Sequence, residues 1–196
     1  MHLFDAALDV NEIRTLGTVV REARTQVFTE ARIEDAASRG RLIGFGTVSW
    51  TIIGPTPEGF VYTDPGSGVA DSPSLPPLAE AYGARSRPDG RYVIDGLSPR
   101  IGTDSMHHGP ILVTLEATAL SSASADVRSD GLMVQTASTR LVRAARRGPF
   151  VSSAEVIGVV GDTVACRAEM RDEGADDCVV AVGLFRFTVP ERHFRR

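Results

Sequence analysis

The sequence predicts an α+β protein in which antiparallel strands are wrapped around one buried helix. Residues 111–123 are apolar on nearly every side, which is typical of a helix covered by other elements. The segments that follow, 132–143 and 150–160, are predicted strands separated by a turn at 144–149. Two further strands joined by an acidic turn come after them, and a similar pair occurs near the start of the chain.

The buried helix is predicted to begin at Pro110. Proline is tolerated in the first turn of a helix, because its missing N–H group would have no partner there. A short predicted strand at Tyr92–Ile94 precedes this helix, and the strands after it continue to about residue 190. The order of strand, helix and antiparallel strands indicates one complete α+β domain over residues 78–190.

The pair of strands is repeated at a distance of 137 residues. Residues 27–52 align without a gap with residues 164–189. In both copies, two strands rich in β-branched and aromatic residues flank an acidic turn that contains glycine. We interpret residues 1–53 as a partial copy of the later domain, with its C-terminal strands only. The identical pairs are Val27/Val164, Ala31/Ala168, Asp35/Asp172, Gly46/Gly183 and Thr51/Thr188.

The two copies are separated by a segment that differs in composition, residues 54–77. Six of the eleven prolines fall in this segment, together with glycine and serine. Since proline cannot donate to a strand ladder and glycine favours turns, we predict a linker or a long surface loop. The chain is therefore predicted to consist of a partial unit (1–53), a linker (54–77), a complete domain (78–190) and a basic tail (191–196).

The composition argues against several classes of protein. A net charge of −4 with 23% charged residues fits neither a nucleic-acid-binding surface nor a disordered chain. No apolar run approaches the roughly 20 residues of a membrane-spanning helix, and residues 1–5 do not begin a signal peptide. Cys166 and Cys178 could pair across a hairpin, but reduced, buried thiols fit two cysteines in predicted strands better. We expect a cytoplasmic protein that binds neither nucleic acid nor membranes.

Three segments of the complete domain resemble one known family. Residues 106–116, Met-His-His-Gly-Pro-Ile-Leu-Val-Thr-Leu-Glu, resemble the His-Gly-Gly or Gln-Gly-Gly turn that opens the central helix of hotdog-fold acyl-CoA thioesterases of the PaaI type. Residues 139–149 resemble that family's strand ending in an Arg-Pro-Ala-x-x-Gly turn, and residues 78–83 resemble its short leading helix. The resemblance implies a hotdog fold, an antiparallel sheet wrapped around a central helix, with one complete unit preceded by a partial one.

The resemblance also implies which residues carry out catalysis. In the family a carboxylate lies nine residues after the His or Gln of the turn, and counting from His107 reaches Glu116. This carboxylate would attack the thioester carbonyl or serve as the base for a water molecule. Both roles suit a carboxylate on a largely apolar helix, where desolvation destabilises the charged form. The family's oxyanion donor, a backbone N–H at the start of the helix, corresponds to Gly109 or to its neighbour His108.

The register of this motif has an alternative. If the motif began at His108, the acidic position would fall on Ala117 and catalysis would be lost. We prefer the register from His107, because it keeps both Gly109 and Glu116 in place.

Other positions depart from the family's pattern or have a simpler explanation. His108 stands where the family has a second small residue, and Ile101 stands where many relatives have Asn, with Asp104 nearby as a candidate substrate-binding residue. Glu116 also has a non-catalytic interpretation, in which it pairs with an arginine such as Arg140 or caps a helix of a partner chain. Adjacent histidines point apart, and no acidic or cysteine cluster accompanies them, so we predict no metal site.

Three arginines in and beside the predicted turn, Arg143, Arg146 and Arg147, are candidates for binding the phosphates of coenzyme A. The guanidinium group matches phosphate geometry, although a solvated turn would show the same pattern.

The resemblance implies an acyl-CoA thioesterase that needs no metal or organic cofactor, coenzyme A being part of the substrate. A non-catalytic acyl-CoA-binding protein of the same fold is an alternative. A hydratase of the related MaoC type is a third candidate, to which Asp104 and His108 correspond superficially. Hotdog units of the family pack in pairs, and an incomplete sheet invites pairing, so we expect a homo-oligomer, a dimer or larger.

Overall fold

The structure is a computed structural model that describes residues 1–38, 40–52 and 74–188. It divides into two compact units, Met1–Leu75 (unit 1) and Pro76–Arg196 (unit 2), and each is described by itself. Of the predicted linker, residues 54–73 lie outside the described residues, as does the whole predicted tail, 191–196.

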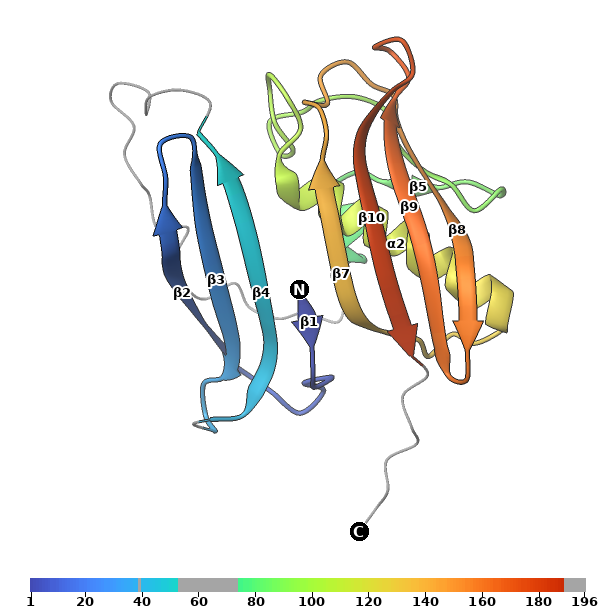
Figure 1. Cartoon of the computed structure of the whole chain (residues 1–196). Helices are drawn as coiled ribbons and strands as arrows, with labels where there is room; N and C mark the ends of the chain where they lie inside the picture. The colour runs from blue at the N-terminus through green and yellow to red at the C-terminus, as the bar shows by residue number, and fades with distance from the viewer. Residues whose placement is uncertain (39, 53–73, 189–196) are drawn as a thin grey trace. The chain divides into compact units, whose positions relative to one another are not determined.

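Unit 2 is an antiparallel sheet with one long helix across one face (Figure 1). Its strands follow the order β7-β10-β9-β8-β6-β5, and each assigned pair along this order is antiparallel. This confirms the predicted α+β arrangement of one helix and antiparallel strands. The elements are α1 (Leu78–Ala81), β5 (Arg85–Ser86), β6 (Tyr92–Ile94), α2 (His108–Val127), β7 (Met133–Leu141), β8 (Phe150–Val160), β9 (Thr163–Asp172) and β10 (Cys178–Thr188).

The long helix α2 packs its buried side against β8, β9 and β10. Ile111, Leu115, Ala119 and Ala123 follow one another at every fourth position, and each is at most 3% exposed. They join a core that includes Phe150 and other sheet residues. No helix within the described ranges has the length and hydropathy that crossing a membrane would require.

Both ends of α2 differ from the prediction. The helix begins two residues before Pro110, at His108, because proline fits any first-turn position where the N–H group is not used. It continues past the predicted end at residue 123 to Val127, since no residue there breaks a helix. It stops where Arg128 adopts a left-handed conformation (φ 54°) and the Ser129 N–H donates back to the Ser124 carbonyl at 3.2 Å.

Valine substitutions at two buried threonines of α2 are expected to change the free energy of unfolding in opposite directions. The Thr118 hydroxyl donates to the Thr114 carbonyl (2.7 Å) and is hydrogen-bonded to Ser152 Oγ (2.8 Å), whereas Thr114 Oγ1 is buried with no partner among the described residues. We expect Thr114→Val to raise the free energy of unfolding by about 1 kcal/mol, and Thr118→Val to lower it by about 1–2 kcal/mol. Urea denaturation followed by circular dichroism measures both, and a destabilised Thr114→Val variant would contradict the prediction.

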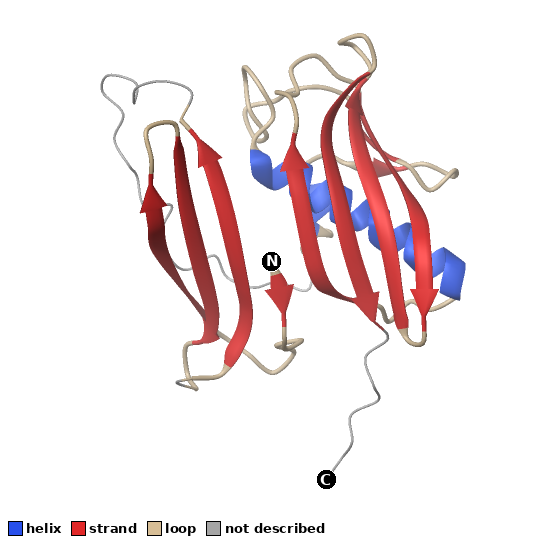
Figure 2. Ribbon diagram, viewed as in Figure 1, coloured by secondary structure: helices blue, strands red, loops and turns tan. Residues whose placement is uncertain are grey.

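Unit 1 is a smaller antiparallel sheet in the order β2-β3-β4-β1. The residues described for this unit contain no helix (Figure 2). Its strands are β1 (His2–Leu3), β2 (Ile13–Glu22), β3 (Gln26–Asp35) and β4 (Leu42–Thr51).

The predicted repeat is present in the strand pairing of both units. Ile13 lies opposite Asp35 in unit 1, as Phe150 lies opposite Asp172 in unit 2. The β2–β3 register shifts around Val20, and the β8–β9 register shifts at the equivalent Ile157; β3–β4 and β9–β10 also shift at equivalent positions. Strand register and bulges therefore repeat at the distance of 137 residues, and the repeat extends to a third strand, β2. That unit 1 is a partial copy of a complete domain stays an interpretation.

Candidate active site

Gly109 and His108, the residues predicted to supply the oxyanion donor, lie at the start of α2. His107 precedes the helix in an extended conformation (φ −67°, ψ 161°), and its side chain makes no capping hydrogen bond. Gly109 is the second helical residue, in the turn whose N–H groups have no acceptor within a helix. These N–H groups and the positive end of the helix dipole favour negative charge at this end of α2.

Glu116 lies on the same side of α2 as Gly109. The two residues are seven positions apart, which is close to two turns and leaves them within about 20° of each other around the helix axis. The Glu116 side chain is half-buried, and burial raises the pKa of its carboxyl above the ordinary value. It makes no hydrogen bond or ion pair within the described part of the chain, so the predicted alternative, a pair with Arg140, is not observed.

The loop before α2 is hydrogen-bonded to the predicted turn at residues 144–149, which we call the arginine turn. The Met106 N–H donates to the Ala145 carbonyl at 2.8 Å, and the His107 N–H donates to the Ile101 carbonyl at 2.7 Å. Ala145 lies between Arg143 and Arg146 in sequence. The fold therefore brings together two candidate segments that are almost 40 residues apart, the start of α2 and the turn before β8.

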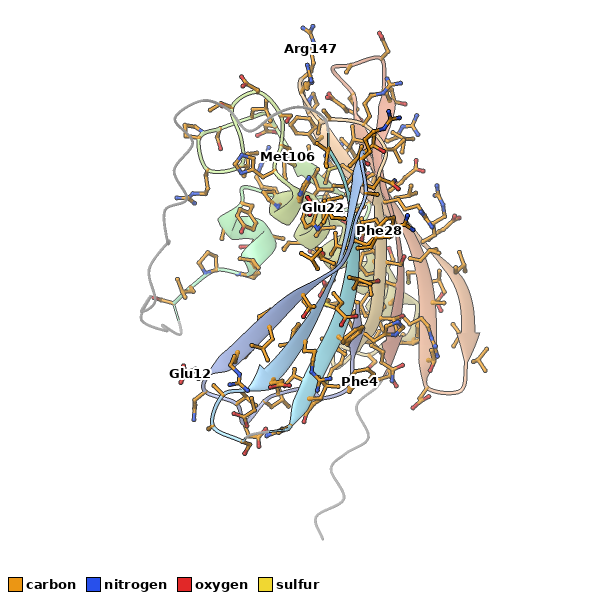
Figure 3. The ribbon with its side chains drawn as sticks, turned by 60° about the vertical axis from the view of Figure 1, so that its left-hand side comes forward. Phe4, Glu12, Glu22, Phe28, Met106 and Arg147 are labelled. Carbon is orange, nitrogen blue, oxygen red and sulfur yellow. The ribbon has the colours of Figure 1, made fainter. Side chains whose placement is uncertain are left out.

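The three predicted arginines line one cavity. Its volume is about 640 Å³, and the side chains of Arg143, Arg146 and Arg147 are exposed to solvent there. Arg147 extends away from the ribbon at the end of the β7–β8 connection (Figure 3). The connection between β9 and β10 forms the other wall. The lining residues are Arg143, Ala144, Arg146, Arg147, Gly174, Ala175, Asp176 and Cys178.

The Asp172 side chain holds the arginine turn in place through hydrogen bonds. The sequence analysis did not assign this role to Asp172. It is fully buried at the end of β9, and its two carboxylate oxygens accept three backbone N–H groups. The donors are Arg146 (2.8 Å), Arg147 (3.0 Å) and Gly148 (2.8 Å). The available signal was the identity of Asp172 with Asp35 in the repeat, which indicates a shared structural role at the end of a strand.

Tyr82 is a second residue that the sequence analysis missed. A Cβ atom at Gly109 would lie 3.7 Å from the Tyr82 hydroxyl oxygen, so this hydroxyl is close to the start of α2. Tyr82 directly follows α1, which packs against α2. Nothing in the spacing of the sequence links position 82 to position 109.

The remaining candidate residues from the sequence make few specific contacts. Asp104 is exposed in the loop before α2 and makes no hydrogen bond or ion pair among the described residues, and His107 and His108 are exposed. Within those residues no group of three or more His, Cys, Asp or Glu could hold a metal ion. Both cysteines are free: Cys178 is partly buried, and burial raises the pKa of the Cys166 thiol to about 11.

Comparison with solved structures identifies the fold. The tesB protein of Mycobacterium avium subspecies paratuberculosis has a TM-score of 0.58 at 13% identity, over 91% of this chain and 72% of that one. A hot dog fold protein from Alicyclobacillus acidocaldarius has a TM-score of 0.54 at 13% identity, over 91% and 73%. A thioesterase from Haemophilus influenzae has a TM-score of 0.51 at 14% identity, over 59% and 86%. No protein-family model and no curated protein sequence matches the chain.

These likenesses show that the protein has the hotdog fold. The predicted resemblance to hotdog thioesterases is thereby confirmed at the level of the fold. Two of the alignments cover 91% of the chain and so include residues of both units.

Proposed function

We propose that this protein hydrolyses a coenzyme A thioester at the start of α2, with Glu116 as the reacting carboxylate. The observation that carries the proposal is the pairing of two features on one side of a helix. One is a half-buried carboxyl of raised pKa, and the other is the Gly109 amide in the first turn. A solved thioesterase among the similar structures supports this class of reaction.

The chemistry requires only water besides the thioester. Glu116 either attacks the carbonyl carbon directly or removes a proton from the attacking water. The carbonyl oxygen becomes negative in either case, and a backbone N–H such as that of Gly109 stabilises it. The carbon–sulfur bond then breaks and releases the thiol of coenzyme A. Where Glu116 has attacked the carbonyl carbon, the acyl group remains on its carboxylate as an anhydride, which a water molecule hydrolyses. The products of both routes are a carboxylic acid and free coenzyme A. We propose that no metal or organic cofactor takes part.

Thiol release from a panel of short, long and aromatic acyl-CoA substrates tests this proposal. We expect turnover with at least one of them, seen as a thiol that reacts with a chromogenic disulfide. Tight acyl-CoA binding without thiol release would favour the non-catalytic alternative instead, for which the bulky His108 at the start of α2 is the supporting observation. A change in enoyl absorbance without thiol release would favour a hydratase.

We propose that the arginine cavity binds the phosphates of coenzyme A. Three guanidinium groups line it, and the Met106–Ala145 hydrogen bond links its wall to the start of α2. We expect the double variant Arg146→Ala/Arg147→Ala to raise KM about tenfold with kcat little changed, because phosphate contacts contribute to binding. Steady-state kinetics at two salt concentrations measure this. Arg24→Ala, an exposed arginine of unit 1, is the control; an unchanged KM in the double variant would contradict the proposal.

We also propose that the working form is a homo-oligomer. Glu116 is half-buried, and Leu112, one turn before it on α2, is 40% exposed. A second subunit over these residues would shield Glu116 from water. Size-exclusion chromatography with light scattering is expected to give at least twice the mass of one chain, and a clean monomer would contradict the proposal.

A further inference from the structure

We infer that the Tyr82 hydroxyl is a second hydrogen-bond donor to the thioester carbonyl oxygen at the start of α2, beside the Gly109 N–H group. This inference rests on the proposed hydrolysis and adds a catalytic residue to it. Tyr82 donates a hydrogen bond to the oxygen as it becomes negative and keeps its own proton. The bonds that form and break therefore remain those of the reaction at Glu116.

The space beside Gly109 opens onto the Tyr82 hydroxyl. A Cβ atom at Gly109 would lie 3.7 Å from this hydroxyl oxygen. Apart from the backbone of α2 and the residues next to Gly109, no other atom of the described residues lies within 4 Å of that position. Gly109 is exposed, so a ligand can enter this space from solvent. A carbonyl group there would meet the first turn of α2 and the phenol together.

The start of α2 offers fewer N–H donors than an ordinary helix. The first N–H groups of a helix have no acceptor within it and are available to a ligand. In α2, however, Pro110 has no N–H group, and the His107 N–H donates to the Ile101 carbonyl at 2.7 Å. Oxyanion sites combine backbone N–H groups with side-chain donors, among them the tyrosine hydroxyl. Tyr82 therefore adds, from the end of α1, a donor that Pro110 does not supply.

The Tyr82 ring is held by packing while its hydroxyl is left without a protein partner. The ring is partly buried and packs against the core of unit 2. Its hydroxyl makes no hydrogen bond within the described part of the chain. Because the ring is already ordered, little side-chain entropy is lost when the hydroxyl binds a ligand. A donor that is ordered before the reaction is what oxyanion stabilisation requires.

One loop, residues 98–102, holds both the end of α1 and the start of α2. On one side, the Arg100 guanidinium donates to the Ala81 carbonyl, directly before the tyrosine, at 2.9 Å. On the other side, the Ile101 carbonyl accepts the N–H of His107, directly before α2. The same short loop thus fixes the phenol and the first turn of α2 relative to each other.

Tyr82→Phe removes the hydroxyl and keeps the ring, so it tests the donor alone. We expect kcat for thiol release to fall by a factor of about 10²–10³ with KM little changed, because the hydrogen bond strengthens as the oxygen becomes negative. Tyr92→Phe is the matched control. Tyr92 lies in β6, is partly buried and packs against the same core, so its loss of a hydroxyl is expected to leave kcat unchanged.

An infrared measurement tests the contact without turnover. The probes are acetyl-CoA, decanoyl-CoA and benzoyl-CoA, each with carbon-13 at the thioester carbonyl, bound to the full chain carrying Glu116→Gln. The difference between labelled and unlabelled complexes isolates the carbonyl stretch. We expect a lower frequency in the complex than in solution, because hydrogen bonds weaken the carbonyl bond. Adding Tyr82→Phe is expected to reverse part of this shift, and adding Tyr92→Phe is expected to leave it in place.

The two measurements separate this inference from the proposed hydrolysis. If the native chain releases thiol and Tyr82→Phe releases it equally fast, the hydrolysis stands and the role of Tyr82 is overturned. If the native chain releases none, the hydrolysis fails and the carbonyl stretch decides. A shift that Tyr82→Phe reduces would then support the contact, whereas an unchanged shift, or no binding of any probe, would overturn it. Equal effects of Tyr82→Phe and Tyr92→Phe would indicate a general loss of packing and would also overturn it.

Discussion

Glu116→Gln is expected to lower thioester hydrolysis by a factor of about 10²–10⁴. Glutamine keeps the size of the side chain and its place on α2, but it can neither attack a carbonyl as a carboxylate nor accept a proton from water. The variant is expected to bind acyl-CoA with little change, because the arginine cavity is untouched. Thiol release at saturating substrate measures kcat, and full activity in the variant would show that another residue, or another register of the motif, carries the reaction.

Asp126→Asn is the matched control for this experiment. It removes one carboxylate from the same helix, at an exposed position in the last turn. We expect unchanged thiol release, so that a loss in both variants would point to the net charge or the stability of α2 rather than to the carboxyl of Glu116.

The pH dependence of stability gives a second expectation for Glu116→Gln. Burial raises the pKa of Glu116 in the folded chain, so the unfolded state releases its proton at a lower pH than the folded state. The native protein therefore loses stability as pH rises from the ordinary glutamate pKa through the raised one. Glutamine does not titrate, so the variant is expected to have a higher Tm than the native protein at pH 7. Below the ordinary pKa, near pH 3.5, the two Tm values should converge.

Asp172→Ala is expected to lower the free energy of unfolding by about 3–5 kcal/mol. The substitution leaves three backbone N–H groups of the arginine turn without their acceptor, and the site is fully buried. Asp172→Asn is expected to cost less, because its amide oxygen can still accept from Arg146 and Arg147. Urea denaturation measures both variants, and a loss below about 1 kcal/mol for Asp172→Ala would contradict this account of the turn.

The repeat supplies a control for Asp172. Asp35 holds the equivalent position in unit 1, but it accepts only one described backbone bond, from Ala37 at 2.8 Å, and lies 3.7 Å from Arg41. Asp35→Ala is therefore expected to destabilise the protein less than Asp172→Ala. A disordered arginine turn should also raise KM for acyl-CoA in Asp172→Ala and leave KM unchanged in Asp35→Ala.

Local patterns predicted the secondary structure closely where they were strong. The strand β8 has the predicted bounds, because alternation and turn residues lie next to each other in the sequence. The observed ends of α2 differ from the predicted ones, because helix ends depend on the backbone conformation of single residues such as Arg128. The candidate pair Gly109 and Glu116 was implied by the resemblance of residues 106–116 to the hotdog thioesterase motif, and the geometry of α2 then places the two residues on the same side.

Contacts between segments that are far apart in the sequence could not be predicted from local patterns. The Met106–Ala145 bond, the Asp172 carboxylate under the arginine turn and the Tyr82 hydroxyl beside Gly109 all join segments far apart in the chain. Each depends on how strands pair and how the helix packs on them, and a single sequence carries no periodic signal for such contacts.

The sequence by itself determined the α+β class, the buried helix and the two copies of the strand pair, because each follows from hydrophobic periodicity and turn residues. The resemblance to the hotdog thioesterase family implied the candidate carboxylate, and the arginine-rich turn indicated the candidate phosphate-binding residues. Only the tertiary structure decided that the arginines line one cavity, that the turn carrying them is hydrogen-bonded to the loop before α2, and that burial raises the pKa of Glu116. Burial and proximity are properties of packed surfaces, and residues distant in sequence jointly create them.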